Sequence, residues 1–156
     1  MTGLIIAASV GSAIAAALGT MVVSEEIAAL EIMSISPVEF LVLPRLAALM
    51  IMMPILTLYT NIIGIVGGAV VGATQLGVSF NAYFDNAQLY AQNKDLYVGL
   101  LKAVIFGMVI ATVACHQGFH ATGGAVGVGQ ATRRTVIVSF LTILVLGYII
   151  TRMFYQ

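Results

Sequence analysis

Four long runs of apolar residues, almost free of charge, constrain this chain more than any other feature. We place them at residues 3–23, 46–75, 99–115 and 135–151, and the first two contain no charged residue. At about 1.5 Å per helical residue the first run is roughly 30 Å long, which matches the hydrocarbon core of a bilayer. The runs are continuous rather than alternating, so they favour helices over a transmembrane barrel. The sequence therefore predicts an all-α integral membrane protein, residues 1–156 forming a single domain with about four transmembrane helices.

The composition excludes several classes of function. Only 8% of the residues are charged, against about 25% in a soluble domain. Six Lys and Arg residues balance six Asp and Glu residues, so no basic field exists that would attract a nucleic acid. Cys115 is the single cysteine, which excludes an internal disulfide and a CxxC metal or redox motif.

Small residues recur at four-residue spacing in two of the runs. In lipid, such stripes let helix backbones approach closely, so we predict that both runs pack against other helices. The glycines of these stripes are Gly3, Gly11 and Gly19 in the first run and Gly64, Gly68 and Gly72 in the second.

The connection between the first two runs is acidic, and residues 24–37 predict a short helix. Ser24 is expected to be its N-cap, and Pro37 limits its far end. Its glutamates are spread around the axis, which suits a helix held in a protein pocket better than one lying flat on lipid. We interpret the segment as docking on a cytoplasmic partner, with an ordinary solvated helix as the alternative. The predicted contact residues are Glu25, Glu26, Ile27, Leu30, Glu31 and Met33.

The third connection, residues 116–134, is rich in glycine and is predicted to be a loop. Two spans separate it from residues 24–37, so both connections lie on the same side of the membrane. Lys and Arg near the span ends are balanced three against three, so charge does not decide which side that is. The residues singled out in this loop are Gly123, Gly124, Gly127, Gly129 and Arg134.

No catalytic constellation emerges, and we do not expect an enzyme. A phosphate-binding loop needs a lysine after a glycine, and neither Lys94 nor Lys102 follows one. His116 and His120 share a face if the helix continues. We interpret them as interfacial histidines, with a membrane metal or haem protein as the alternative. A secondary transporter or channel without an ATPase is a further alternative, but it would predict midplane ionisable residues and an inverted repeat, and neither is evident.

Two long motifs carry a resemblance to a known family. The first runs from GSAIAAALGTM at residues 11–21 through SEEI and ALE to LVLPR at 41–45. The second comprises CHQGF at 115–119 and GGAVGVGQAT at 123–132. In order, and over essentially the whole chain, these motifs resemble the MlaE/YrbE family of ABC-transporter permeases, which move phospholipids between bacterial membranes. Ser9, Ala17 and Val126 depart from the family pattern, because a charged residue is usual at each of these positions.

The resemblance implies a permease homodimer in the bacterial inner membrane, with a lipid in a cavity between the two copies. Residues 24–37 would be a cytoplasmic coupling helix inserted into a separate ATPase subunit. That subunit would hold ATP and Mg, and this chain would hold no cofactor or metal. A STAS-domain protein and a ring of MCE-domain subunits would complete the assembly. Because the chain begins inside an apolar run, we expect it to lack the family's N-terminal amphipathic helix and first span.

Overall fold

The computed structural model describes residues 1–75 and 93–155, and every regular element in these ranges is a helix. Four of the helices are long and apolar enough to cross a membrane. They confirm the prediction of an all-α membrane protein with four spans. Their bounds are Thr2–Val23, Val38–Thr74, Asp95–Phe119 and Gly124–Phe154.

The first two spans each contain one turn of π-helix. The first consists of α1 (Thr2–Ile6), the π-turn η1 (Ala7–Gly11) and α2 (Ser12–Val23). The second consists of η2 (Val38–Val42) and α4 (Leu43–Gln75), which continues through Pro54 as one helix. Between them lies the short helix α3 (Glu26–Ile32). The third and fourth spans are α6 (Asn93–Phe119) and α7 (Gly124–Tyr155).

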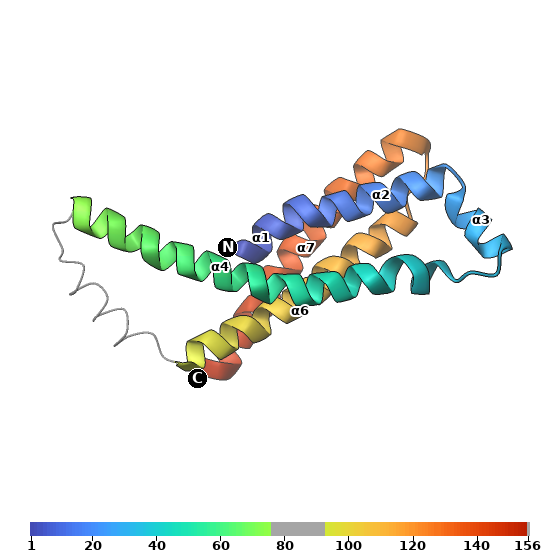
Figure 1. Ribbon diagram of the computed structural model, residues 1–156. Coiled ribbons are helices and arrows are strands. Elements are labelled where there is room, and N and C mark those ends of the chain that lie inside the picture. Colours follow the sequence, from blue (N-terminus) through green and yellow to red (C-terminus); the bar gives the residue numbers. More distant parts are fainter. Residues whose placement is uncertain (76–92, 156) are drawn as a thin grey trace.

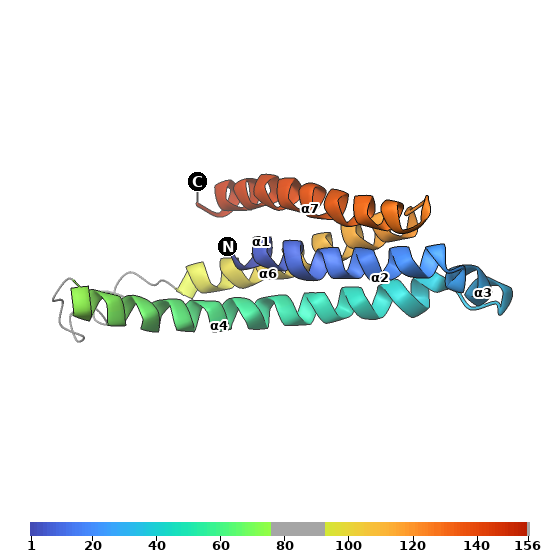
Figure 2. The ribbon, with the colours of Figure 1, turned by 90° about the horizontal axis from the view of Figure 1, so that it is seen from above.

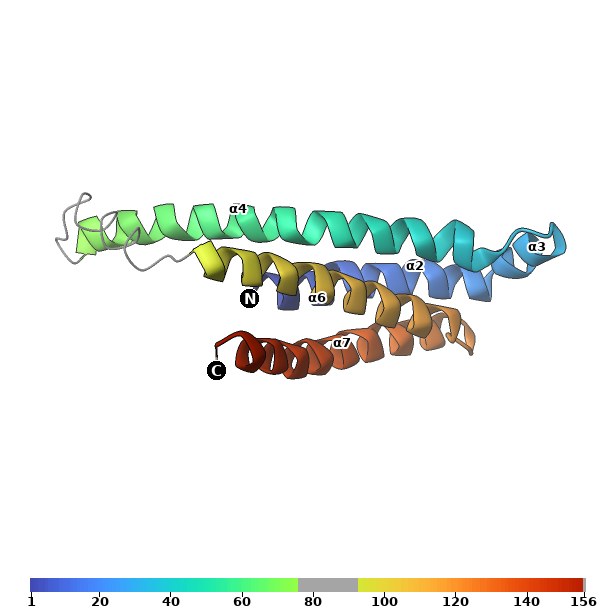
Figure 3. The ribbon, with the colours of Figure 1, turned by 90° about the horizontal axis from the view of Figure 1, so that it is seen from below.

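The spans form three layers, with α6 in contact with all the others. Figures 2 and 3 show α4 on one side, α7 on the other, and α6 with the first span between them. The far part of α4 extends past the ends of the other helices. Large apolar side chains are exposed along all four spans, such as Ile5, Ile63, Tyr97 and Leu141. An apolar outer surface of this kind suits contact with lipid tails.

Two clusters of buried residues hold the layers together. The larger lies midway along the bundle and joins all four spans through Ala7, Met53, Ile110 and Ile143. The smaller lies near α3 and joins Leu18 of α2, Leu41 of η2 and Cys115 of α6. Alanine is the commonest buried apolar residue in the described chain, and small side chains allow the close helix approach that packing in lipid requires.

Several predicted span boundaries differ from those in the structure. The second span begins at Val38 instead of residue 46, because Glu39 stands in the first helical turn, where the helix dipole favours a carboxylate. The third connection is far shorter than predicted, since α6 continues to Phe119 and α7 begins at Gly124. Of the predicted connection at 76–98, α6 takes the part from Asn93 onward, and the rest lies outside the described residues.

The predicted loop residues therefore lie mostly in a helix. Only Gly123 remains in the connection; Gly124, Gly127, Gly129 and Arg134 belong to α7. Glycine weakens a helix in water by about 1 kcal/mol, but in this tight turn glycine is needed for steric reasons. Gly123 and Gly124 have positive φ values of 88° and 69°. A Cβ at Gly127 would collide with the carbonyl oxygen of Thr122.

Candidate functional site

The short helix α3 lies outside the bundle, beyond the ends of α2 and α4 (Figure 1). The turn between α6 and α7 lies at the same end of the molecule. We call this end the α3 end. The prediction that the first and third connections share one side therefore agrees with the arrangement of the helices.

The capping role predicted for Ser24 is wrong. Ser24 is the C-cap of α2, and its hydroxyl donates to the Thr20 carbonyl oxygen (3.0 Å) and lies 3.1 Å from Glu26 Oε1. The N-cap of α3 is Glu25, whose backbone is left-handed with φ 61°. The chain needs this sharp reversal because only two residues separate the two helices.

The predicted contact residues of α3 divide into two faces. Ile27 and Leu30 are half-buried and pack against the cluster of Leu18, Leu41 and Cys115. The other predicted residues are exposed: Glu25, Glu26, Glu31 and Met33. Ile32 beside them is 85% exposed, the highest value for a large apolar side chain inside a described helix. One face of α3 therefore packs against a cluster to which three spans contribute, and the other presents carboxylates and apolar side chains outward.

The glycine stripe of the first span faces other helices. A Cβ at Gly3 would lie 3.2 Å from Phe106, one at Gly11 would lie 3.2 Å from Ile110, and one at Gly19 would lie 3.1 Å from Ala121. The stripe of the second span differs, since a Cβ at Gly64 would meet nothing within 4 Å. A packing role for Gly64, Gly68 and Gly72 stays a prediction. Gly64 is exposed, so a helix that packs on it would lie outside the described part of this chain, whereas Gly72 is buried.

Two glycines that the stripes did not single out make the closest helix contacts. A Cβ at Gly107 would lie 2.8 Å from the Leu49 carbonyl oxygen, and one at Gly118 would lie 2.7 Å from Leu18 Cβ. Both are on α6, eleven residues apart, which is close to three full helical turns. This three-turn spacing is the sequence signal that could have identified Gly107 and Gly118 as a pair on one face of α6.

His116 and His120 stack on each other at the C-terminal end of α6. Their ring centroids are 4.4 Å apart, and His120 Nδ1 donates to the His116 carbonyl oxygen at 2.8 Å. In the ranges 1–75 and 93–155 no group of three His, Cys, Asp or Glu side chains converges on a metal position. For a metal or haem site, the described chain therefore offers these two histidines as a ligand pair without a third group beside them. Metal analysis of the purified protein tests this hypothesis.

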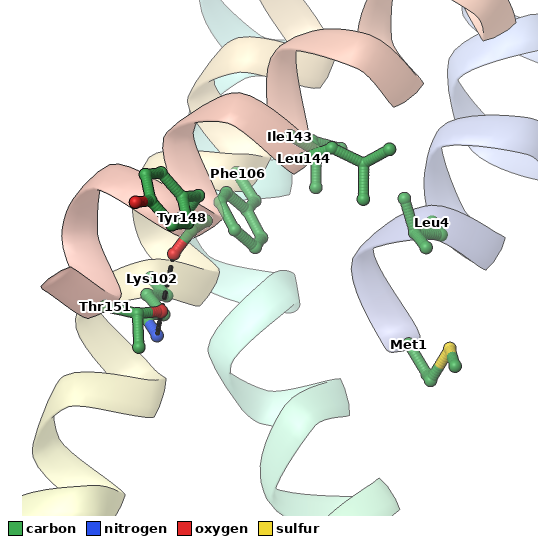
Figure 4. A pocket seen from close by; sticks show the side chains of 9 residues that line it. Met1, Leu4, Lys102, Phe106, Ile143, Leu144, Tyr148 and Thr151 are labelled. Atoms are coloured by element: carbon green, nitrogen blue, oxygen red, sulfur yellow. Dashed lines mark hydrogen bonds between the residues drawn. The ribbon is translucent and has the colours of Figure 1, made fainter.

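A cavity of about 440 Å³ lies near the opposite end of the bundle, between α1, α6 and α7 (Figure 4). Its walls are apolar, with Leu4 on one side and Phe106, Ile143 and Leu144 on the other. Lys102 Nζ donates to Thr151 Oγ1 at 2.7 Å, and the Thr151 hydroxyl donates to the Gly147 carbonyl oxygen. We call this the Lys102 cavity.

The Lys102 cavity combines an apolar interior with one fixed cation. A smaller hollow of about 190 Å³ on the other side of Lys102 adds Thr57 and Asn61 of α4. Such an arrangement can hold an amphiphile whose chains lie against the apolar wall and whose anionic group lies at the ammonium. The sequence analysis did not single out Lys102 as a site residue, because its partner Thr151 is 49 residues away in the sequence.

Comparison with known proteins gives one family and several relatives. The family model described as Permease MlaE matches residues 1–153. A probable ABC transporter permease protein of Rickettsia prowazekii is 40% identical over the whole chain, which covers 60% of that protein. The intermembrane phospholipid transport system permease protein MlaE of Haemophilus influenzae is 34% identical over 97% of this chain and 58% of its own length. The chloroplastic protein TRIGALACTOSYLDIACYLGLYCEROL 1 of Arabidopsis thaliana is 33% identical over the whole chain and 45% of its length. The chain thus spans about 60% of the length of these bacterial relatives.

Proposed function

The chain belongs to the MlaE permease family, and on that basis we propose that it is the membrane permease subunit of an ABC transporter that moves phospholipids between membranes. The relatives' names support an ABC permease, and the name of the Haemophilus protein supports a phospholipid as cargo. In this proposal the chain performs transport and no covalent chemistry. ATP and Mg bind to a separate ATPase subunit.

The observation that carries the proposal is the position of α3. It projects past the spans, presents Glu26, Glu31 and Ile32 outward, and buries Ile27 and Leu30 against the bundle. A partner that pulled on the outer face would move the inner face with it, because a single helix carries both. The inner face packs against a cluster formed by residues of α2, η2 and α6, and the close backbone contacts of α3 are with α2. A displacement of α3 would therefore act on α2 directly and on the other two spans through the cluster.

The α3 end would accordingly face the cytoplasm, and the Lys102 cavity would face the opposite side of the bacterial inner membrane. We further propose that two copies of the chain pair, and that an MCE-domain protein and a STAS-domain protein join the assembly. The phospholipid would occupy the Lys102 cavity during transfer, with its phosphate near the ammonium group. The exposed apolar stripe of α4 around Gly64 offers a surface for the second copy.

The test is a double charge reversal on the outer face of α3, Glu25→Lys with Glu26→Lys, in the permease reconstituted with its ATPase. We expect binding of the ATPase to weaken about tenfold or more and ATP-driven lipid transfer to fall with it. The reason is that lysines would replace the carboxylates that, in this proposal, face basic groups of the ATPase. Glu39→Lys is the matched control, since Glu39 is exposed at the same end but lies on η2. Unchanged binding and transfer in the double variant would refute the coupling role of α3.

A further inference from the structure

A small polar pocket lies between the end of α6 and the beginning of α7, at the α3 end. Its volume is about 50 Å³, and its walls are mainly polar, in contrast to those of the Lys102 cavity. Gln117 and His120 border it on the α6 side, Thr122 lies in the turn, and Gln130 and Arg134 belong to α7. The pocket shares no lining residue with the Lys102 cavity. We call it the Arg134 pocket.

The Arg134 pocket offers one positive charge and several neutral hydrogen-bond donors. The guanidinium of Arg134 carries five N–H donors, and the carboxamides of Gln117 and Gln130 carry two each. Among the described residues none of these three side chains has a hydrogen-bond or ion-pair partner, so their donors are available to a ligand. No acidic residue lines the pocket. A guanidinium beside neutral donors, without a carboxylate, favours an oxyanion as the ligand.

The local structure explains both the shape of the pocket and its size. Gln130 and Arg134 are four residues apart on α7, so their side chains lie on one face of that helix. The small residues Gly127 and Ala131 on the same helix line the pocket and leave room between the polar side chains. Since one water molecule needs about 10–15 Å³, the volume admits about four oxygen-sized atoms. That is the size of a phosphate group, whereas a nucleotide or a whole lipid headgroup with its glycerol would not fit.

Arg134 lies at the depth where a bilayer has its phosphates. The residues that follow it, 135–151, carry no charge, and the next charged residue is Arg152. At about 1.5 Å per residue this stretch of α7 covers roughly 25 Å, which is close to the thickness of the hydrocarbon core. The two arginines that bound the stretch therefore lie in the two interfacial regions. Basic pockets between membrane helices at this level bind the headgroups of anionic phospholipids.

We propose that the Arg134 pocket binds the phosphate of an anionic phospholipid from the leaflet on the α3 side, with the glycerol and acyl chains outside the pocket. A free phosphate ion has the same chemistry, but the depth of Arg134 favours the lipid, whose phosphate is held at this level by the bilayer. The bound lipid would be a fixed component that joins α6 to α7, and it would not be cargo, because the pocket encloses no acyl chain. This proposal needs only a chain that spans a membrane, so it does not rest on the proposed function.

The test measures which lipids the full chain retains, by native mass spectrometry after transfer from micelles with equal amounts of phosphatidylglycerol and phosphatidylcholine. Arg134→Gln removes the charge of the pocket. Arg133→Gln is the matched control, since it removes the same charge from an exposed neighbour that does not line the pocket. Gln130→Glu adds a carboxylate to the pocket, and Val126→Glu adds one at an exposed position of α7 outside it. All chains carry Lys102→Met, so that the Lys102 cavity adds no preference of its own.

With the pocket intact we expect phosphatidylglycerol to be retained about fivefold more than phosphatidylcholine, as one partly shielded ion pair would give. Arg134→Gln and Gln130→Glu should each remove most of this preference, whereas Arg133→Gln and Val126→Glu should keep it. Equal retention of the two lipids by the intact pocket would overturn the proposal. So would a preference that survives both pocket variants, or one that falls equally in the controls. If Arg134→Gln does not fold, Gln130→Glu decides the test, because position 130 is exposed.

A second measurement separates the lipid from a free phosphate ion. Thermal unfolding in neutral detergent is followed with added inorganic phosphate and no lipid, and then with added phosphatidylglycerol. We expect the lipid to raise the unfolding temperature and the ion to leave it unchanged. A rise with inorganic phosphate that Arg134→Gln abolishes, without any preference for phosphatidylglycerol, would assign the pocket to the free ion and overturn the lipid as its occupant. Neither measurement uses ATP or an ATPase, so each can fail independently of the proposed function.

Discussion

Glu25 and Ser34 bound α3 on either side, and both have left-handed backbones, with φ of 61° and 60°. Neither is a glycine, the residue that adopts this conformation without strain. These two residues are the only non-glycine residues with positive φ in the described ranges. The short helix is therefore joined to both neighbouring spans through a strained residue, and it can be reoriented by changing two backbone torsions rather than by unfolding a helix.

The first prediction concerns this strain. Ser34→Gly should raise the free energy of unfolding by about 1 kcal/mol, because glycine removes the steric cost of the left-handed conformation. Thermal unfolding followed by circular dichroism in detergent would measure it. Ser36→Gly is the control with the opposite sign: Ser36 Oγ accepts a hydrogen bond from the Glu39 backbone at 3.2 Å, and its loss should destabilise. An equal fall in both variants would contradict strain at Ser34.

The second prediction concerns the closest helix contacts. Gly118→Ala and Gly107→Ala should each lower stability by about 1–3 kcal/mol, because the new methyl group would meet atoms that cannot move away without backbone shifts. Gly99→Ala on the same helix is the control, since its Cβ would meet nothing within 4 Å. It should be neutral or slightly stabilising. The same thermal measurement applies, and a Gly118 variant as stable as the Gly99 variant would argue against this packing.

The third prediction concerns the open stripe on α4. Gly64→Ile should leave the stability of a single copy unchanged, because no atom of the described chain lies near the new side chain. It should reduce the fraction of dimer, measured by light scattering on the purified protein, because a bulky residue prevents close helix approach. Gly99→Ile provides the comparison at another open position. A dimer fraction that does not change would exclude this stripe as the contact between copies.

The fourth prediction concerns the Lys102 cavity. Lys102→Met keeps the length and apolar character of the side chain but removes the charge, so transfer of an anionic phospholipid should fall several-fold while folding is retained. Thr151→Val should have a smaller effect in the same direction, because it removes only the hydroxyl that holds Lys102 in place. ATP-driven transfer of a fluorescent phospholipid measures both. Full activity of Lys102→Met would remove Lys102 from the transport route.

The fifth prediction concerns the stacked histidines. If the chain is a transport subunit, replacing His116 and His120 by alanine should leave lipid transfer unchanged, and elemental analysis of the unsubstituted protein should find no stoichiometric metal. Loss of transfer together with loss of a bound metal would revive the metalloprotein hypothesis. Loss of transfer alone would assign the pair a structural role at the end of α6.

The sequence predicted the number and type of the spans, because long uncharged runs admit few structures in a bilayer. The sequence predicted the first and last residues of the spans less well. Glu39 and the pair Arg133 and Arg134 were predicted to be connection residues, although all three lie in helices. A charge near a helix end is inexpensive in the interfacial region, so hydropathy alone places the boundary too far inside the span.

The neighbours of each helix could not be predicted. A four-residue spacing shows that Gly11 and Gly64 each lie on a stripe, but only the structure shows that the first faces Ile110 and that nothing described faces the second. Arg45 illustrates the same limit. Its sequence position suggested no more than the end of a motif, whereas the burial of its Nη1 atom depends on how the helices pack around it.

The central position of α6 also bears on how the protein is made. The first span approaches α4 closely only near its own beginning, and the backbones of α2 and α4 make no close approach. When the first two of these four spans are in the bilayer and α6 is not, these two helices have few contacts with each other. Most of their partners arrive with the third span, so assembly of the bundle must follow the insertion of α6. Until then, lipid must solvate the surfaces at Gly11, Leu18 and Leu49 that α6 later covers.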